Sequence, residues 1–387
     1  MKTIVSIIEY FYPYARSGDV IAALYEVEQL SNHGYRVVNF YKYIGVLNTD
    51  RTNTPEYTAK IFLNSHPAPV NFVISNQPSN YRLGVILAES TGAKHIIRQH
   101  INYESLFRAI DYLGIPPDLI ITRRPYRETL THFSEANSSA DLVIATDANT
   151  ILMNSDPNLY FCPPAICSAE TKNQSLAGGA ERLRSNTCHL PSQENARGDK
   201  FHIAISGRLD DPTKGGERIF QALKIVNGET SGFVLNAYGN MPQWLAQKMI
   251  KLLGPRFKHY GWIDSRGVYL SAFSNNNVFL TLPYYEAYGL ALQEAINLGV
   301  IPVSTKQGLA LLLSQNVNTQ SVFIDTFIDN NHREDYIVAK AASIIMQIFE
   351  NRNNLADLAK VLQSIVAQLY GNYNDLPGIL DRIGAVQ

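Results

Sequence analysis

Residues 278–304 read VFLTLPYYEAYGLALQEAINLGVIPVS and contain a complete strand–loop–helix–strand unit. The apolar run at 278–283 is too short for a buried helix, and Pro283 ends it. Gly289 opens a helix predicted over 289–298, and a second apolar run follows at 301–304. Two short buried strands joined by a helix are typical of a parallel sheet, so this segment predicts an α/β fold.

The same alternation extends through the rest of the chain and restarts once. A stretch at 166–200, rich in Ser, Asn, Gln and Gly, separates the two series and is interpreted as a linker or surface loop. The chain is therefore expected to form two doubly wound, Rossmann-like domains at 1–165 and 201–370, facing each other across a ligand-binding cleft. A C-terminal helix around 371–387 can pack back on the first domain. Strands are expected at 3–8, 36–41, 72–75, 95–100, 119–122, 142–146, 201–206, 233–238 and 257–262, and helices at 19–33, 215–226, 242–253 and 336–370.

The amino-acid composition excludes several classes of protein and of site. Hydrophobic residues make up 45% of the 387 residues, which excludes global disorder. Lys and Arg (33) almost balance Asp and Glu (34), so a nucleic-acid-binding surface is not expected. The three cysteines are expected to be reduced thiols, and the scattered His and Asp lack the spacing of metal ligands.

The chain shows neither a signal-peptide core nor an apolar run long enough to span a membrane. We therefore expect a cytoplasmic protein, with at most peripheral contact with the inner face of a membrane. A basic stretch at 123–127 (RRPYR) could serve that contact, and the alternative interpretation is a solvated charge run.

The segment 206–216, SGRLDDPTKGG, lies where a predicted strand ends and a helix begins. Backbone N–H groups and the helix dipole favour an anion at such a position. Arg208 offers a planar fork for phosphate oxygens and Lys214 a mobile cation, so the segment suits a diphosphate. The alternative is a solvated turn with capping residues.

Glu286 and Glu294 are two carboxylates separated by seven residues, the first in the loop and the second inside the helix. Carboxylates accept hydrogen bonds from sugar and ribose hydroxyls, while the N–H groups of Gly289 and Leu290 suit an anion. Alternatively, Glu286 caps the helix dipole and Glu294 is an exposed helix residue.

Three blocks in order carry a resemblance to a known family. The chain has Tyr12-Pro13 and Gly18 near the first predicted helix, then the G-R-L-(x)-K-G block from Gly207, then E-x7-E within P-x-x-E-x-Y-G-L-x-x-x-E-A. This pattern resembles family 4 of the retaining GT-B glycosyltransferases. Two positions depart from it: Ser17 replaces the first glycine of a pair, and Ala287 replaces a glycine after the first glutamate.

The resemblance implies a role for each matching position. Arg208 and Lys214 would bind the donor diphosphate, Glu286 the transferred sugar and Glu294 the ribose. His100 would contact the donor sugar, although a satisfied histidine at a strand end is an equal alternative, and Trp262 would lie by the nucleobase. The implied catalytic residues are Arg208, Lys214, Glu286 and His100, and the implied donor-binding residues are Gly18, Gly207, Arg208, Lys214, Trp262, Glu286, Tyr288, Gly289, Leu290 and Glu294.

The function that follows from the resemblance is transfer of a hexosyl-type sugar, in polysaccharide or related biosynthesis. The donor would be a nucleoside-diphosphate sugar, the acceptor a glycan, a lipid-linked or a small molecule, and the anomeric configuration would be retained without a metal. A nucleotide-sugar epimerase, a phosphorylase-like enzyme and a non-catalytic partner subunit remain alternatives. A dinucleotide-binding dehydrogenase and a P-loop enzyme are disfavoured because neither glycine-rich fingerprint occurs.

Overall fold

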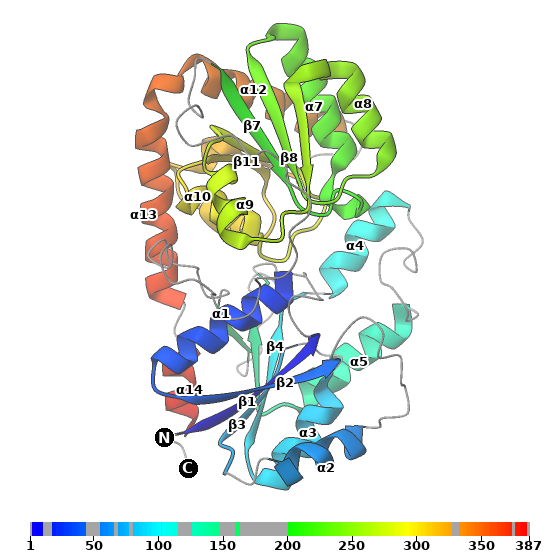
Figure 1. Cartoon of the computed structure of the whole chain (residues 1–387), viewed down its shortest axis with the longest axis vertical. Helices are drawn as coiled ribbons and strands as arrows, with labels where there is room; N and C mark the ends of the chain where they lie inside the picture. Colours follow the sequence, from blue (N-terminus) through cyan, green and yellow to red (C-terminus); the bar gives the residue numbers. More distant parts are fainter. Residues whose placement is uncertain are drawn as a thin grey trace. The chain divides into compact units, whose positions relative to one another are not determined.

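The computed structural model describes residues 2–10, 18–43, 55–65, 69–76, 80–101, 103–114, 126–147, 159–162, 200–326, 333–373 and 376–384. These residues form two compact units. The described parts of Met1–Cys167 and Leu369–Gln387 make up unit 1, and those of Ser168–Gln368 make up unit 2. Each unit is a parallel sheet with helices packed against it (Figure 1). Nearly all of the predicted linker lies outside the described residues, so its boundaries stay predictions.

The sheet of unit 1 has six parallel strands in the order β2-β1-β3-β4-β5-β6. All residues of the interior strands β3 and β5 are buried, as expected when helices cover both faces. The short edge strand β6 was not predicted, and the predicted strand at 119–122 lies outside the described residues. The elements are β1 (Thr3–Tyr10), α1 (Gly18–Asn32), β2 (Arg36–Tyr43), α2 (Pro55–Ser65), β3 (Phe72–Ser75), α3 (Tyr81–Thr91), β4 (Lys94–Gln99), α4 (Tyr103–Leu113), α5 (Tyr126–Ser139), β5 (Leu142–Ala145), β6 (Leu159–Phe161) and α14 (Leu376–Gly384).

The C-terminal helix α14 belongs to unit 1 and completes its core. Leu376, Ile379 and Leu380 are buried in one cluster with residues of the sheet. At the polar side of the helix, Asp381 Oδ1 accepts hydrogen bonds from the Tyr35 hydroxyl at 2.5 Å and from Lys2 Nζ at 3.1 Å. The chain therefore returns to the N-terminal unit after completing unit 2.

The sheet of unit 2 also has six parallel strands, in the order β12-β11-β10-β7-β8-β9. The strand order reverses between β7 and β10, which pair directly, and in open α/β sheets ligands bind beyond the carboxyl ends of the strands at such a point. The elements are β7 (Phe201–Ser206), α7 (Gly216–Glu229), β8 (Phe233–Tyr238), α8 (Gln243–Leu253), β9 (Phe257–Gly261), α9 (Arg266–Phe273), β10 (Val278–Thr281), α10 (Leu290–Asn297), β11 (Ile301–Thr305), α11 (Leu309–Leu313), β12 (Phe323–Ile324), α12 (Arg333–Glu350) and α13 (Leu355–Tyr373).

The helical stretch predicted at 336–370 is helical in the structure but interrupted once. It consists of two helices, α12 and α13, separated by Asn351 and a 3-10 turn at Arg352–Asn354. Asn favours turns over helix interiors because its side chain competes for backbone hydrogen bonds, and three of the four residues at 351–354 are Asn. The helix α9 and the short strand β12 were also not predicted.

Candidate functional site

The two segments singled out in the sequence lie together in unit 2 because β7 and β10 are neighbours. The loop after β7 contains Lys214, and the loop after β10 contains Glu286. Tyr284 N donates a hydrogen bond to Thr213 O at 2.8 Å, which joins the two loops through their backbones. Gly215, with a φ of +71°, allows the close approach, since a Cβ at this position would lie 2.0 Å from Leu282 O.

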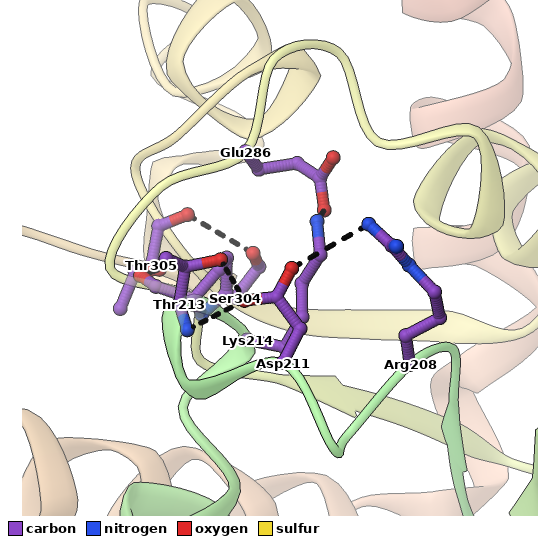
Figure 2. A network of polar contacts seen from close by, with 8 residues as sticks. Arg208, Asp211, Thr213, Lys214, Glu286, Ser304 and Thr305 are labelled. Carbon is purple, nitrogen blue, oxygen red and sulfur yellow. Dashed lines mark hydrogen bonds and ion pairs between the residues drawn. The ribbon is translucent and has the colours of Figure 1, made fainter. Parts of the chain in front are cut away.

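Lys214 and Glu286 contact each other directly in this structure. Lys214 Nζ donates a hydrogen bond to Glu286 Oε2 at 2.9 Å, and about a quarter of each side chain is exposed (25% and 26%). Figure 2 shows the ammonium and the carboxylate meeting between the two loops. The sequence predicted that both residues line one site, and the structure brings them together there. Their direct pairing with each other was not predicted.

Arg208 reaches the same region from the start of the loop after β7 (Figure 2). Its side chain is 63% exposed, and its Nη2 lies 3.5 Å from Asp211 Oδ2. Asp211 in turn caps the short turn that precedes α7, where its Oδ1 accepts bonds from Thr213 N at 2.9 Å and Thr213 Oγ1 at 2.7 Å. Asp211 was not assigned a role from the sequence, although Asp before Pro-Thr is a recognisable N-cap signal.

The loop that carries Glu286 is fixed by the end of β11 and by the loop that follows this strand. Thr305 Oγ1 donates a hydrogen bond to Pro283 O at 2.8 Å, and Leu309 N donates one to Tyr288 O at 2.6 Å. A Cβ on Gly308 would lie 2.6 Å from Tyr288 O, so this loop also packs tightly against the backbone. The resulting rigidity is what a preorganised binding site requires.

Gly289 and Leu290 form the beginning of α10, beside Glu286. Gly289 is the N-cap residue with a φ of +92°, and a Cβ there would lie 3.3 Å from Glu286 Cγ. The first N–H groups of a helix have no partner within the helix, so an anion next to Glu286 would meet them. Tyr288, also predicted to bind the donor, is only 5% exposed, and its carbonyl is the acceptor of the Leu309 N–H.

Glu294 lies on α10 and forms an ion pair with Arg266 at the beginning of α9. Its side chain is 14% exposed, so the alternative of an exposed helix residue is wrong. Arg266 was missed in the sequence because α9 is short and contains Gly267, which weakened its helical pattern. The pairing places a cation next to the carboxylate that was assigned to the ribose.

Gly207 and Trp262 lie at the same carboxyl edge of the sheet, after β7 and β9 respectively. Gly207 has a φ of +120°, and its carbonyl lies so close to Gly239 that a Cβ on Gly239 would be 2.3 Å away. Trp262 is 39% exposed. An exposed indole at the edge where ligands bind is suitably placed for a nucleobase, and this role stays a prediction.

His100 and Gly18 belong to unit 1, so their predicted approach to the residues of unit 2 stays a prediction. Gly18 is the first residue of α1. His100 follows β4 directly and is buried, with its Nδ1 3.4 Å from Thr146 Oγ1. Its Nε2 has no hydrogen-bond partner among the described residues. Burial, reinforced by the positive charge of Arg98, lowers the pKa of His100 to about 3, so the imidazole is neutral at pH 7.

The lowered pKa of His100 predicts that acid destabilises unit 1. Between the folded pKa of about 3 and an ordinary value near 6.5, the unfolded chain binds a proton that the folded chain does not. The free energy of unfolding should therefore fall by about 2 kcal/mol between pH 7.5 and pH 5 through this residue. Urea unfolding followed by circular dichroism at the two pH values measures the effect. His100→Gln should lose that much less stability, and an unchanged pH dependence in this variant would contradict the prediction.

Other predictions made from the sequence concern residues outside the described part of the chain: Tyr12, Pro13, Ser17 and the basic stretch at 123–125. Among the described helices, none is both long enough and apolar enough to cross a membrane. Within the same residues, no three His, Cys, Asp or Glu side chains are grouped as ligands of a metal ion. Cys162 is buried, whereas Cys167 and Cys188 lie outside the described residues.

Comparison with solved structures defines the fold class. The chain is similar over its full length to sucrose-phosphate synthase from Thermosynechococcus elongatus, with a TM-score of 0.70 and 17% identity, covering 100% of both chains. HepE from Anabaena, in complex with UDP and glucose, gives a TM-score of 0.63 and 16% identity, covering 100% of this chain and 99% of HepE. WaaG, a glycosyltransferase involved in lipopolysaccharide biosynthesis, gives 0.59 and 15%, covering 99% of each chain. The predicted GT-B fold class, with two parallel α/β sheets, is thereby confirmed.

A family model matches the second half of the chain. Residues 189–360 match the family described as glycosyl transferases group 1. The matched range includes both loops of the site, Arg266 and the E-x7-E pair. No curated protein matches the chain at a significant level.

Proposed function

We propose that this chain is a group 1 glycosyltransferase that transfers a hexosyl-type sugar from a nucleoside-diphosphate sugar to an acceptor. The acceptor would be a glycan, a lipid-linked molecule or a small molecule. The observation that carries the proposal is the contact of Lys214 with Glu286 at 2.9 Å, beside the N-terminus of α10. Support comes from the family match over residues 189–360 and from the UDP and glucose bound to HepE, which has the same fold.

The proposed chemistry depends on the negative charge that builds up on the departing diphosphate. Lys214, Arg208 and the first N–H groups of α10 are cationic or polar donors that stabilise this charge before the reaction begins. The diphosphate competes with Glu286 for Lys214, and the released carboxylate then accepts hydrogen bonds from the sugar hydroxyls. The Lys214–Glu286 ion pair thus holds both binding groups in place before the donor binds.

We further propose that the sugar retains its anomeric configuration and that no metal ion is needed. Arg208 and Lys214 supply the positive charge that a metal would otherwise provide. Retention rests on the resemblance of the E-x7-E region to family 4, and the anomeric proton coupling of the product would establish it.

The donor is identified by a panel of nucleotide sugars. We expect one of them, with UDP-sugars tested first, to raise the Tm and, with water taking the place of the acceptor, to release free nucleoside diphosphate as the sugar is hydrolysed. A ligand at about 100 times its Kd stabilises a protein by about 2.7 kcal/mol, which a thermal-shift assay detects readily. Parallel samples with EDTA test the metal independence, and loss of activity there would contradict it. If no nucleotide sugar produces a shift or a product, the proposed function is wrong.

A further inference from the structure

A buried guanidinium lies directly behind the loop that carries Glu286. Arg218, in the first turn of α7, has only 2% of its side chain exposed. Its Nε donates a hydrogen bond to Glu334 Oε2 at 2.6 Å, and its Nη2 donates to Glu334 Oε1. Its third nitrogen, Nη1, faces Leu282 O at 3.4 Å and Pro283 O at 3.3 Å. One side chain therefore connects three segments: α7, the loop after β10 and the first turn of α12.

Tyr284 closes the cluster from the loop side. The Arg218 guanidinium lies over the Tyr284 ring, with Cζ 3.5 Å from the ring centroid. The Tyr284 hydroxyl donates a hydrogen bond to Glu334 Oε2 at 3.2 Å, so Arg218 and Tyr284 share one carboxylate. Contacts of a guanidinium with a carboxylate, carbonyls and an aromatic face require its planar fork, which a lysine cannot reproduce.

Stability alone is a poor explanation for this buried charge. Taking a guanidinium out of water is costly, and apolar side chains of similar volume often stabilise a core equally well. The charged cluster instead fixes the orientation of the loop after β10. Two backbone carbonyls of that loop and the Glu334 carboxylate all bind the same planar guanidinium, so their relative positions are set. The cluster is also close in sequence to the site: Arg218 is four residues after Lys214, and Tyr284 is two residues before Glu286.

We propose that Arg218, held by Glu334 and Tyr284, is a positioning residue that sets the Glu286 carboxylate against Lys214. This inference rests on the proposed function, in which Glu286 binds the transferred sugar. Arg218 itself acts through the loop and does not contact the donor. Loss of Arg218 should slow the transfer of the sugar, which Glu286 binds, while leaving the binding of a nucleoside diphosphate nearly unchanged.

The test compares Arg218→Lys and Glu334→Gln with the wild-type protein. We expect kcat with the nucleotide sugar to fall about tenfold or more, while the Kd for the free nucleoside diphosphate changes less than about threefold. Glu217→Gln is the matched control, because Glu217 is the neighbouring residue on α7 and its contacts lie on the exposed surface: an ion pair with Lys248 at 2.9 Å and a hydrogen bond from Gln221 Nε2 at 2.7 Å. The control should keep the wild-type kcat, and an equal loss in the control would overturn the proposal.

A double-mutant cycle separates positioning from general destabilisation. In a Glu286→Gln background, Arg218→Lys should reduce kcat less than about twofold further, because the group that it positions is already lost. If Arg218→Lys lowers kcat by a further tenfold in this background, then Arg218 does not act through Glu286, and the proposal is overturned. Unchanged kcat in Arg218→Lys on the wild-type background would overturn it as well.

Hydrogen exchange in the ligand-free protein tests the structural part without any substrate. The amides of 282–289 should exchange faster in Arg218→Lys than in the wild type, and unchanged exchange would overturn the proposal. A wild-type protein that binds no nucleotide sugar would instead overturn the proposed function, and the positioning role of Arg218 in that function with it. The failure of this inference alone is recognised by an active wild type whose Arg218 variants are equally active.

Discussion

Replacement of Lys214 by alanine is expected to lower the turnover of the nucleotide sugar by about 10²–10³-fold. Lys214 Nζ lies 2.9 Å from Glu286 Oε2, and in the proposed reaction it stabilises the charge on the departing diphosphate. Removing one such preorganised donor typically costs about 2.7–4 kcal/mol of transition-state stabilisation. The measurement is the steady-state release of nucleoside diphosphate by the purified variant.

The stability of Lys214→Ala should change far less than its activity. About three quarters of each side chain in the Lys214–Glu286 pair is covered, but the pair remains open to water, and ion pairs of this kind contribute about 0–1 kcal/mol. Lys248→Ala is a suitable control because Lys248 also pairs with a glutamate, Glu217, on the exposed surface of α7 and α8. Normal donor binding with unchanged kcat in Lys214→Ala would show that the proposed site is wrong.

The sheet and the two loops of the candidate site could be predicted because their signals are local. The strands β7 and β8 were predicted with their observed bounds, since each is a short apolar run that ends at a glycine. The loops after β7 and β10 were expected to contribute to one site, and the parallel pairing of these strands brings them together. A strand-to-helix loop can be recognised from its own sequence, without knowledge of the segments that pack against it.

The pairing of side chains within the site could not be predicted, because it depends on contacts between distant segments. Glu294 forms an ion pair with Arg266, which lies on a helix that was not predicted. Arg218 pairs with Glu334, which follows it by more than a hundred residues in the sequence. Nothing in the sequence indicated that Arg218 is buried, since a single arginine in a helix is ordinarily interpreted as a solvated residue. Only the packing of α7 against α12 and the loop after β10 shows that it is buried.

Replacement of Gly215 by alanine is expected to destabilise unit 2 by about 3 kcal/mol, through two separate effects. The φ of +71° is unfavourable for a residue with a Cβ, and the new Cβ would lie 2.0 Å from Leu282 O. The obstacle is backbone, so it cannot rotate away as a side chain would, and the loop that carries Glu286 must move. Activity should therefore fall together with stability. Unfolding followed by tryptophan fluorescence reports on unit 2, because Trp244 and Trp262 are the two tryptophans of the chain.

Two further glycines of unit 2 separate the causes of this expected loss. Gly299 has a similar φ of +76°, but the nearest atom to its Cβ would be Gln363 Nε2 at 3.9 Å, so Gly299→Ala should show the backbone strain alone, about 1–2 kcal/mol. Gly228 lies on α7 with open space around it, and Gly228→Ala should be neutral or stabilising by up to about 1 kcal/mol. If Gly215→Ala is no less stable than Gly299→Ala and fully active, then the two loops do not need their close contact. In that case the close contact of the two loops cannot be what holds Lys214 and Glu286 in place for the donor.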